Sequence, residues 1–361
     1  MPILSFLLQS SVIRAICALL SLSLCAAPAG HAKEAPAVIK PGLQPCARTQ
    51  VLSPKRLSTF INQAALSLGV PSAVESFARE SIEQLSQHPP FTGWTEASAD
   101  YVPLGPGTHS WLVMLQEAQV PIGYLIITAD EEGGYMLSEY GIGSDLPYSL
   151  NQLEDALTAL GLSLPMDPRM NQGTSLTVET FYDPSSPFWR ISSAGSPSLY
   201  IHGITGDLLP NTAFTSKALT GVTNEDGHIS IAAGLVSSAS SWAPAAAALG
   251  KGSPDPYSNL LWKLGTPRRI VTAESLQPLL IAQSRSAVIF DAGKLNPLLA
   301  GPLSLTGSQL WSRDNQVMMY IAASHHGIRL QRYLPSEILI GHGQFYVQAQ
   351  GTVPSLSLGS P

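Results

Sequence analysis

Hydrophobic and polar residues alternate through the middle of the chain with period two, which is typical of antiparallel strands with one buried face. The alternation predicts strands at residues 94–102, 111–118, 122–129 and 135–140. Short turns rich in glycine and proline separate these strands, and residues 131–134, Glu-Glu-Gly-Gly, are the clearest hairpin turn. A second run of strands is predicted at residues 176–182, 188–192 and 199–203.

Hydrophobic residues at helical spacing precede each run of strands. Ser53 followed by Pro54 is typical of a helix start, and a second helix is predicted between Pro71 and the sequence His-Pro-Pro at 88–90. A third helix is expected at about 149–160, before Gly161. Helix followed by meander thus occurs twice, which predicts two α+β modules.

After residue 210 the sequence becomes rich in Ser, Thr, Gly, Ala and Pro, which indicates a domain boundary. Within this region residues 237–250, SSASSWAPAAAALG, predict a polar turn followed by a buried helix, with Ser241 as its N-cap. Further helices are predicted at 259–265 and 273–283. The strands expected after them are at 287–290, 303–311, 316–322 and 328–333.

The N-terminus predicts export. Arg14 precedes an apolar run at residues 15–27, and Gly30-His31-Ala32 has small residues where signal peptidase would cut. We therefore expect residues 1–32 to be a signal peptide and the protein to be secreted or held at the cell surface, with no membrane span after cleavage. An uncleaved anchor and lipidation at Cys25 remain alternatives.

Composition narrows the function classes. The 361 residues are 45% hydrophobic and 12% charged, enough for a substantial core, and the net charge of −6 gives no basic stripe for nucleic acid. After the signal peptide Cys46 is the only cysteine, so no intramolecular disulfide can form. Histidines and cysteines lack metal-ligand spacing, and we expect neither metal nor cofactor.

Two short motifs resemble known families. Residues 200–209, YIHGITGDLL, are similar to the closing strand and turn of PepSY domains, and Thr205-Gly206 would be a turn with positive φ. Residues 123–127 and 137–141 resemble the pro-region of some secreted papain-like peptidases. The resemblance implies PepSY-like or cystatin-like modules, although two ordinary sheet-and-helix modules are an equal alternative.

Residues 223–346 resemble exported relatives of double-glycine leader peptidases in the order of their elements. That family is papain-like and has a cysteine at a helix start, a histidine on a later strand and an orienting Asp or Asn. Here the cysteine position falls on Trp242 or Ser241, the histidine position on Leu303, and the third position near Ser324. The resemblance therefore implies a degenerate peptidase without its catalytic groups.

Other residues are candidates for a nucleophile and a general base in place of the missing cysteine and histidine. Ser241 could be a nucleophile, with His325 or His326 as its base, but an N-cap and a solvated turn are the simpler interpretations. The leading hypothesis is an exported, non-catalytic protein that binds a peptide or protein in the ancestral cleft. The alternatives are a hydrolase that uses Ser241, and a PepSY-type inhibitor of a separate peptidase.

The predicted fold class is α+β, with tandem helix-plus-meander modules followed by a degenerate papain-like domain. Its expected parts are a signal peptide at 1–32, a linker at 33–52, a first module at 53–147, a second at 148–210, the papain-like domain at 211–350 and a tail at 351–361.

Overall fold

The computed structural model describes residues 69–105, 110–130, 133–162, 176–183, 186–193, 195–211, 236–237, 241–250, 255–281, 286–293, 299 and 301–349. The predicted signal peptide, linker, first helix and tail lie outside these ranges. The fold is α+β with mostly antiparallel sheets, as the sequence predicts. Among the described residues no helix is both long and apolar enough to cross a bilayer.

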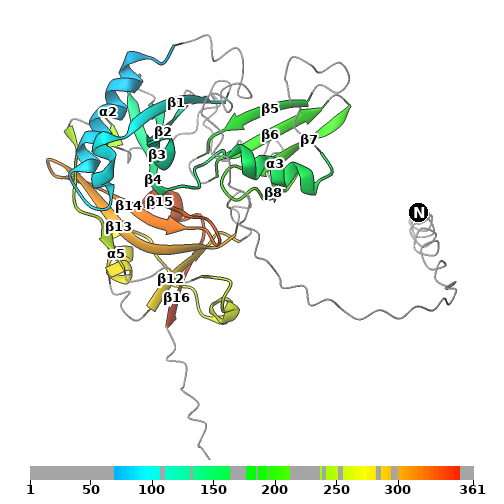
Figure 1. Ribbon diagram of the computed structural model, residues 1–361. Helices are drawn as coiled ribbons and strands as arrows, with labels where there is room; N and C mark the ends of the chain where they lie inside the picture. Colours follow the sequence, from blue (N-terminus) through cyan, green and yellow to red (C-terminus); the bar gives the residue numbers. More distant parts are fainter. Residues whose placement is uncertain are drawn as a thin grey trace, which may run out of the picture. The chain divides into compact units, whose positions relative to one another are not determined.

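A large antiparallel sheet forms the main part of the described structure (Figure 1). Its strands follow the order β1-β2-β3-β4-β15-β14-β13-β12-β16. Their bounds are β1 Ser98–Leu104, β2 Ser110–Glu117, β3 Val120–Ala129, β4 Tyr135–Gly143, β12 Ser286–Asp291, β13 Leu303–Arg313, β14 Gln316–Ser324, β15 Leu330–Pro335 and β16 Gln344–Ala349. The alternation in the sequence located most of these strands, because each has a face that packs into a core.

The first predicted strand starts later than expected. Residues of the 310 helix η1 (Phe91–Glu96) cover its beginning, and β1 starts at Ser98. Phe91 and Trp94 are buried side chains of η1 that pack at 4.8 Å between ring centroids. Gly123 on β3 lacks the Cβ that would collide with the Trp94 ring, so the indole packs directly on the strand.

A smaller antiparallel sheet follows the order β5-β6-β7-β8. The strands are β5 (Leu176–Phe181), β6 (Phe188–Ser193), β7 (Ser196–His202) and β8 (Leu208–Leu209). The helix α3 (Leu150–Ala159) lies against this sheet through Leu150, Leu153 and Leu157 (Figure 1). The predicted turn before β8 is confirmed, since Gly206 has a φ of 75°.

Helices cover the large sheet at both ends. α2 (Ser72–Ser86) packs its apolar side on β2, β3 and β4, and α5 (Ala273–Ile281) packs on the core around β12, β13 and β14. The opposite face of β1–β3 shares a core with the smaller sheet and α3. Two short elements, η4 (Leu260–Leu264) and α6 (Ser336–Leu339), complete the described helices.

The predicted helix after Ser241 is wrong. The chain there forms two short strands, β10 (Ala243–Pro244) and β11 (Ala248–Leu249), that pair with β13. Gly307 permits this pairing, because a Cβ at that position would collide with the carbonyl oxygen of Ala248. Pairing with β13 and burial of Trp242 thus override the helical propensity of the alanines.

The large sheet crosses the boundary predicted at residue 211. β4, from the predicted first module, pairs directly with β15, from the predicted C-terminal domain, in the register Tyr140↔Tyr333. A third short strand, β9 (Val236–Ser237), also pairs with β4. An unpaired β4 edge would expose backbone donors and acceptors, and β15 satisfies them.

Candidate functional site

The residues predicted to replace a peptidase site lie at opposite ends of the β13–β14 hairpin. Ser241 and Trp242 precede Ala243, which pairs with Ser312 near the turn of the hairpin. Leu303 begins β13 at the other end, where Ser304 pairs with Ser324. From Ser304 to Ser312 the strand runs roughly 25 Å at about 3.3 Å per residue. The structure therefore brings Leu303 and Ser324 together but not Trp242.

The same register separates Ser241 from its predicted bases. His325 and His326 follow Ser324 directly, so they lie at the end of the hairpin away from Ser241. General-base activation needs about 2.6–3.2 Å between the heavy atoms. His326 is exposed, and its Nδ1 lies 2.8 Å from Oδ1 of Asp255. The geometry does not bring Ser241 to His325 or His326.

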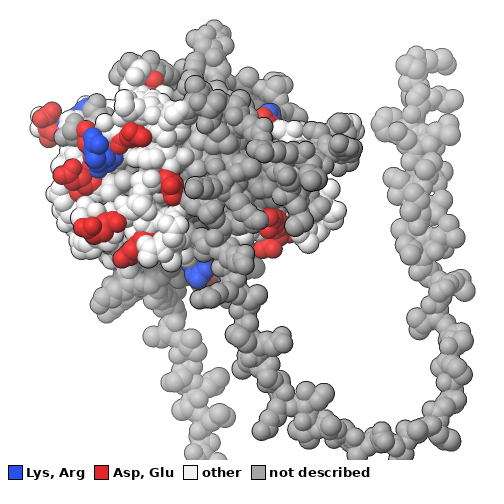
Figure 2. Space-filling model, turned by 45° about the horizontal axis from the view of Figure 1, so that its top comes forward, with Lys and Arg blue, Asp and Glu red and all other residues white. Residues whose placement is uncertain are grey.

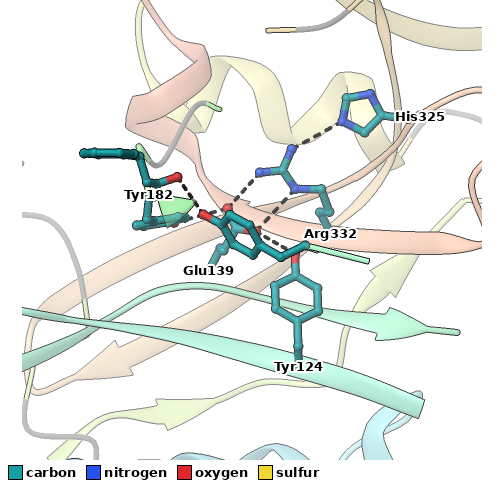
Figure 3. Close-up of polar contacts among 7 residues, drawn as sticks. Tyr124, Glu139, Tyr182, His325 and Arg332 are labelled. Carbon is teal, nitrogen blue, oxygen red and sulfur yellow. Dashed lines mark hydrogen bonds and ion pairs between the residues drawn. The ribbon is translucent and has the colours of Figure 1, made fainter. Parts of the chain in front are cut away.

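His325 instead belongs to a buried polar centre. We define it as Tyr124, Glu139, Tyr182, His325 and Arg332, which Figure 3 shows, together with His202, whose ring packs on that of His325. Its core is an ion pair in which Arg332 Nη2 donates to Glu139 Oε2 at 2.8 Å. Both side chains are 0% exposed. Burial alone would lower the pKa of Arg332, but the charge and hydrogen bond of Glu139, together with the neighbouring Tyr124 and Tyr182, outweigh burial and raise it.

Small residues make room for this ion pair within the sheet. Arg332 on β15 has Gly141 of β4 on one side and Ala323 of β14 on the other. Gly141 also lies beneath the ring of Tyr124, where a Cβ would collide with the ring. The phenol therefore reaches Glu139 Oε1, to which it donates at 2.6 Å. Burial and the charge of Glu139 raise the pKa of Tyr124, so it stays a donor.

The smaller sheet contributes the remaining members of the polar centre. Tyr182, directly after β5, donates to Glu139 Oε2 at 3.1 Å. His202 ends β7, and its ring lies 5.5 Å from that of His325 between centroids. The polar centre therefore joins the two sheets through hydrogen bonds to one carboxylate.

Hydrogen bonds define the protonation of both histidines. Arginine only donates, so Nε2 of His325, 3.3 Å from Arg332 Nη1, accepts and carries no proton. Nδ1 of His202 accepts from the backbone N–H of Thr205 at 3.1 Å, which places the ring proton on Nε2. That Nε2 has no hydrogen-bond partner in the described structure. Burial, together with the neighbouring His325 and Arg332, holds the pKa of His202 well below 6.5.

This polar centre is closed to substrate. Its most exposed member, His325, has only 6% of its surface accessible, and Glu139 is already engaged by Arg332, Tyr124 and Tyr182. A carboxylate held in this way is a fully buried acceptor with its partners in place. We assign the polar centre a structural role in joining the sheets.

An open groove lies at the other end of the large sheet, along the edge strand β16. We call it the β16 groove; it has a volume of about 710 Å³, within the range of about 300–1,000 Å³ typical of ligand sites. Its wall is made by β16 and by the segment that follows η4. The lining residues are Asn259, Leu261, Trp262, Gly265, Thr266, Pro267, Arg268, Arg269, Tyr346, Val347 and Gln348.

Aromatic packing shapes the β16 groove. The ring of Trp262 lies edge-to-face on Tyr346, with 5.0 Å between centroids, and its Nε1 donates to the carbonyl oxygen of Pro256 at 2.7 Å. Leu261 and Leu264 of η4 stay exposed, Leu264 to 85%. Exposed apolar side chains grouped beside a groove are typical of a surface that contacts another molecule.

No protein-family model, curated protein or solved structure matches this chain. Within the described ranges, no group of three or more His, Cys, Asp or Glu side chains gathers at metal-binding geometry.

Proposed function

We propose that this chain is an exported, non-catalytic binding protein that holds an extended peptide segment of a partner along the open edge of β16. The β16 groove is the single observation that carries the proposal, because it combines a strand edge that is only partly paired among the described residues, aromatic side chains and exposed leucines. The proposal moves the expected binding site from the ancestral peptidase cleft to this edge.

The edge already accepts one backbone partner from its own chain. Arg268 forms an isolated antiparallel bridge with Phe345, and its N–H donates to the Phe345 carbonyl at 2.7 Å. Backbone groups alternate between the two sides of a strand, so Val347, two residues on, directs its N–H and C=O to the same edge. β12 occupies the other side of β16. A peptide strand could therefore continue the pairing that Arg268 begins.

Binding by strand addition needs no nucleophile, and this agrees with the placement of the candidate catalytic residues. Ser241 and His325 lie at opposite ends of the β13–β14 hairpin, and His325 is bonded to Arg332. Recognition then depends on backbone hydrogen bonds for affinity and on side-chain pockets for selectivity.

The test is selection of peptides from a random library by the purified full chain, followed by calorimetric titration of the selected peptides. Each selected peptide is then made in two N-methylated forms, with methyl groups on alternate backbone nitrogens. Strand addition predicts that only one of the two forms loses binding, by at least about tenfold, because only alternate N–H groups face β16. The unaffected form is the matched control.

Equal loss, or no loss, in both N-methylated forms would contradict strand addition. Mass spectrometry of the peptides after prolonged incubation tests the non-catalytic part of the proposal. Peptide cleavage that disappears in a Ser241→Ala variant would instead support the hydrolase alternative.

A further inference from the structure

The charge of the β16 groove differs from that of the chain as a whole. Among the described residues that line it, Arg268 and Arg269 are the only charged ones, and none is Asp or Glu. Both arginines are exposed, and neither forms an ion pair with a described residue. Lys263 adds a third cation at the rim, with its Nζ 5.3 Å from the centroid of the Trp262 ring.

This basic group stands out on an acidic protein. The chain has 25 Asp and Glu against 19 Lys and Arg, a net charge of −6. On the face seen in Figure 2, Asp and Glu side chains are more frequent than Lys and Arg among the described residues. An anionic partner would thus find cations without a described carboxylate partner at the groove, and repulsion over the face seen in Figure 2.

We infer that the occupant of the β16 groove is an extended acidic peptide segment of a partner protein, with Asp or Glu side chains that contact Arg268 and Arg269. The inference rests on the proposed function and adds the chemical class of its ligand. A guanidinium presents planar donors that match a carboxylate, so the contact favours a carboxylate over other polar groups.

Strand geometry restricts the ligand further. Successive side chains of an extended peptide point to opposite faces, so residues at i and i+2 share one face of the added strand. A carboxylate that reaches the arginines therefore has a neighbour two residues away on the same face. Leu261 and the ring of Trp262 line the groove and suit an apolar side chain there. We therefore expect selected peptides to carry an acidic residue and an apolar residue two positions apart, so that both side chains lie on the face that meets the groove.

The test compares matched peptides that bind the groove. Each acidic residue of a selected peptide is replaced by its amide, Glu by Gln or Asp by Asn, with the backbone unchanged. Each replacement should weaken binding about two- to fivefold, the range for exposed ion pairs. Raising the salt concentration from 50 to 500 mM should remove most of the difference, because exposed charges are screened.

The protein variant Arg268→Gln/Arg269→Gln should lose the preference, so that acidic and amide peptides bind alike. Arg79→Gln is the matched control, since Arg79 is an exposed arginine on α2, distant in the sheet order from β16. The control should keep the preference in full. Thermal unfolding of all variants confirms that the fold is intact.

The outcomes separate the two proposals. Equal binding of acidic and amide peptides to the unmodified protein would overturn this inference and leave strand addition standing. Absence of binding by every peptide would overturn both. Binding that appears only after deletion of residues 351–361 would identify the chain's own tail as the occupant, and dimerisation that Arg268→Gln/Arg269→Gln abolishes would identify a second copy; either result would overturn the inference.

Discussion

Arginine occupies two opposite environments in this protein. Arg332 in the polar centre is 0% exposed, is paired with Glu139 and lies between two strands of the large sheet. Arg268 and Arg269 in the β16 groove are exposed and have no carboxylate partner among the described residues. The buried guanidinium has exchanged water for protein partners, whereas the exposed pair keeps its hydrogen-bonding capacity for another molecule.

The comparison shows that burial, and not residue type, decides whether a guanidinium here is held by protein partners or left open to solvent. A buried ion pair loses hydration and contributes through fixed geometry, so removal of one partner leaves an uncompensated charge. Exposed charges contribute little to folding and remain free for recognition. Variants of the polar centre should therefore change stability, and variants of the β16 groove should change binding.

The largest expected effect is that of Glu139→Gln. The substitution keeps the side-chain shape but leaves the Arg332 charge unpaired in the core, and should lower the free energy of unfolding by about 3–5 kcal/mol. Urea denaturation followed by circular dichroism measures the change. Glu179→Gln is the matched control, because Glu179 pairs with the half-exposed Arg190 at 2.7 Å and its loss should cost only about 0.2–1 kcal/mol. Equal effects of the two variants would contradict the comparison.

A smaller effect is expected from pH through His202. Its pKa in the folded protein is well below 6.5, while the unfolded chain has the ordinary value. Above about pH 6.5 the ring is neutral in both states; as pH falls below that value, the unfolded state binds the proton and stability declines. The slope for one proton is at most about 1.4 kcal/mol per pH unit.

The pH effect is measured as the difference in unfolding free energy between pH 7.5 and pH 5. Because other titratable groups also contribute to the decline, the comparison is with His202→Gln, which should show a shallower decline. A slope that His202→Gln does not reduce would show that His202 is accessible to protons.

The smallest effect on stability is expected from Leu264→Ser beside the β16 groove. The side chain is 85% exposed, so the free energy of unfolding should change by less than about 0.5 kcal/mol. Peptide affinity should nevertheless fall, because an apolar contact of the ligand is lost. Calorimetric unfolding and peptide titration on the same sample separate the two quantities. A destabilisation above about 1.5 kcal/mol would show that Leu264 belongs to the folded core.

Local patterns in the sequence predicted much of the large sheet. β2, β3, β4, β13 and β14 all fall where alternation placed them, because one face of each packs into a core. The α2 helix follows from apolar residues at helical spacing. Pairing across the chain was not predictable in this way, and the β4–β15 contact has no local signature. The helix predicted within residues 241–250 is wrong for the same reason, since pairing with β13 overrides the helical propensity of the alanines.

The two candidate regions were largely invisible in the sequence. Glu139 and Arg332 are 193 residues apart, so the local sequence around either residue does not predict their contact. Gly141 and Ala323 are the small residues beside Arg332. Their connection with the polar centre can be recognised only when the strand register is known. His325 was selected as a possible base, and the structure places it beside Arg332 instead. The β16 groove depends on which strand ends the sheet, which is a property of the whole topology.

The pairing of β4 with β15 also has a consequence for how the chain is made. The ribosome synthesises β4 nearly two hundred residues before β15. Until β15 follows, the edge of β4 lacks this partner strand, and Glu139 is exposed to water. Contacts of such long sequence separation form late and slowly, and open strand edges are prone to aggregation. The pairing of β4 with β15 can form only after the C-terminal part has been synthesised. Arg332 can then form its ion pair with Glu139. A chain built in this order completes its large sheet only near the end of its synthesis.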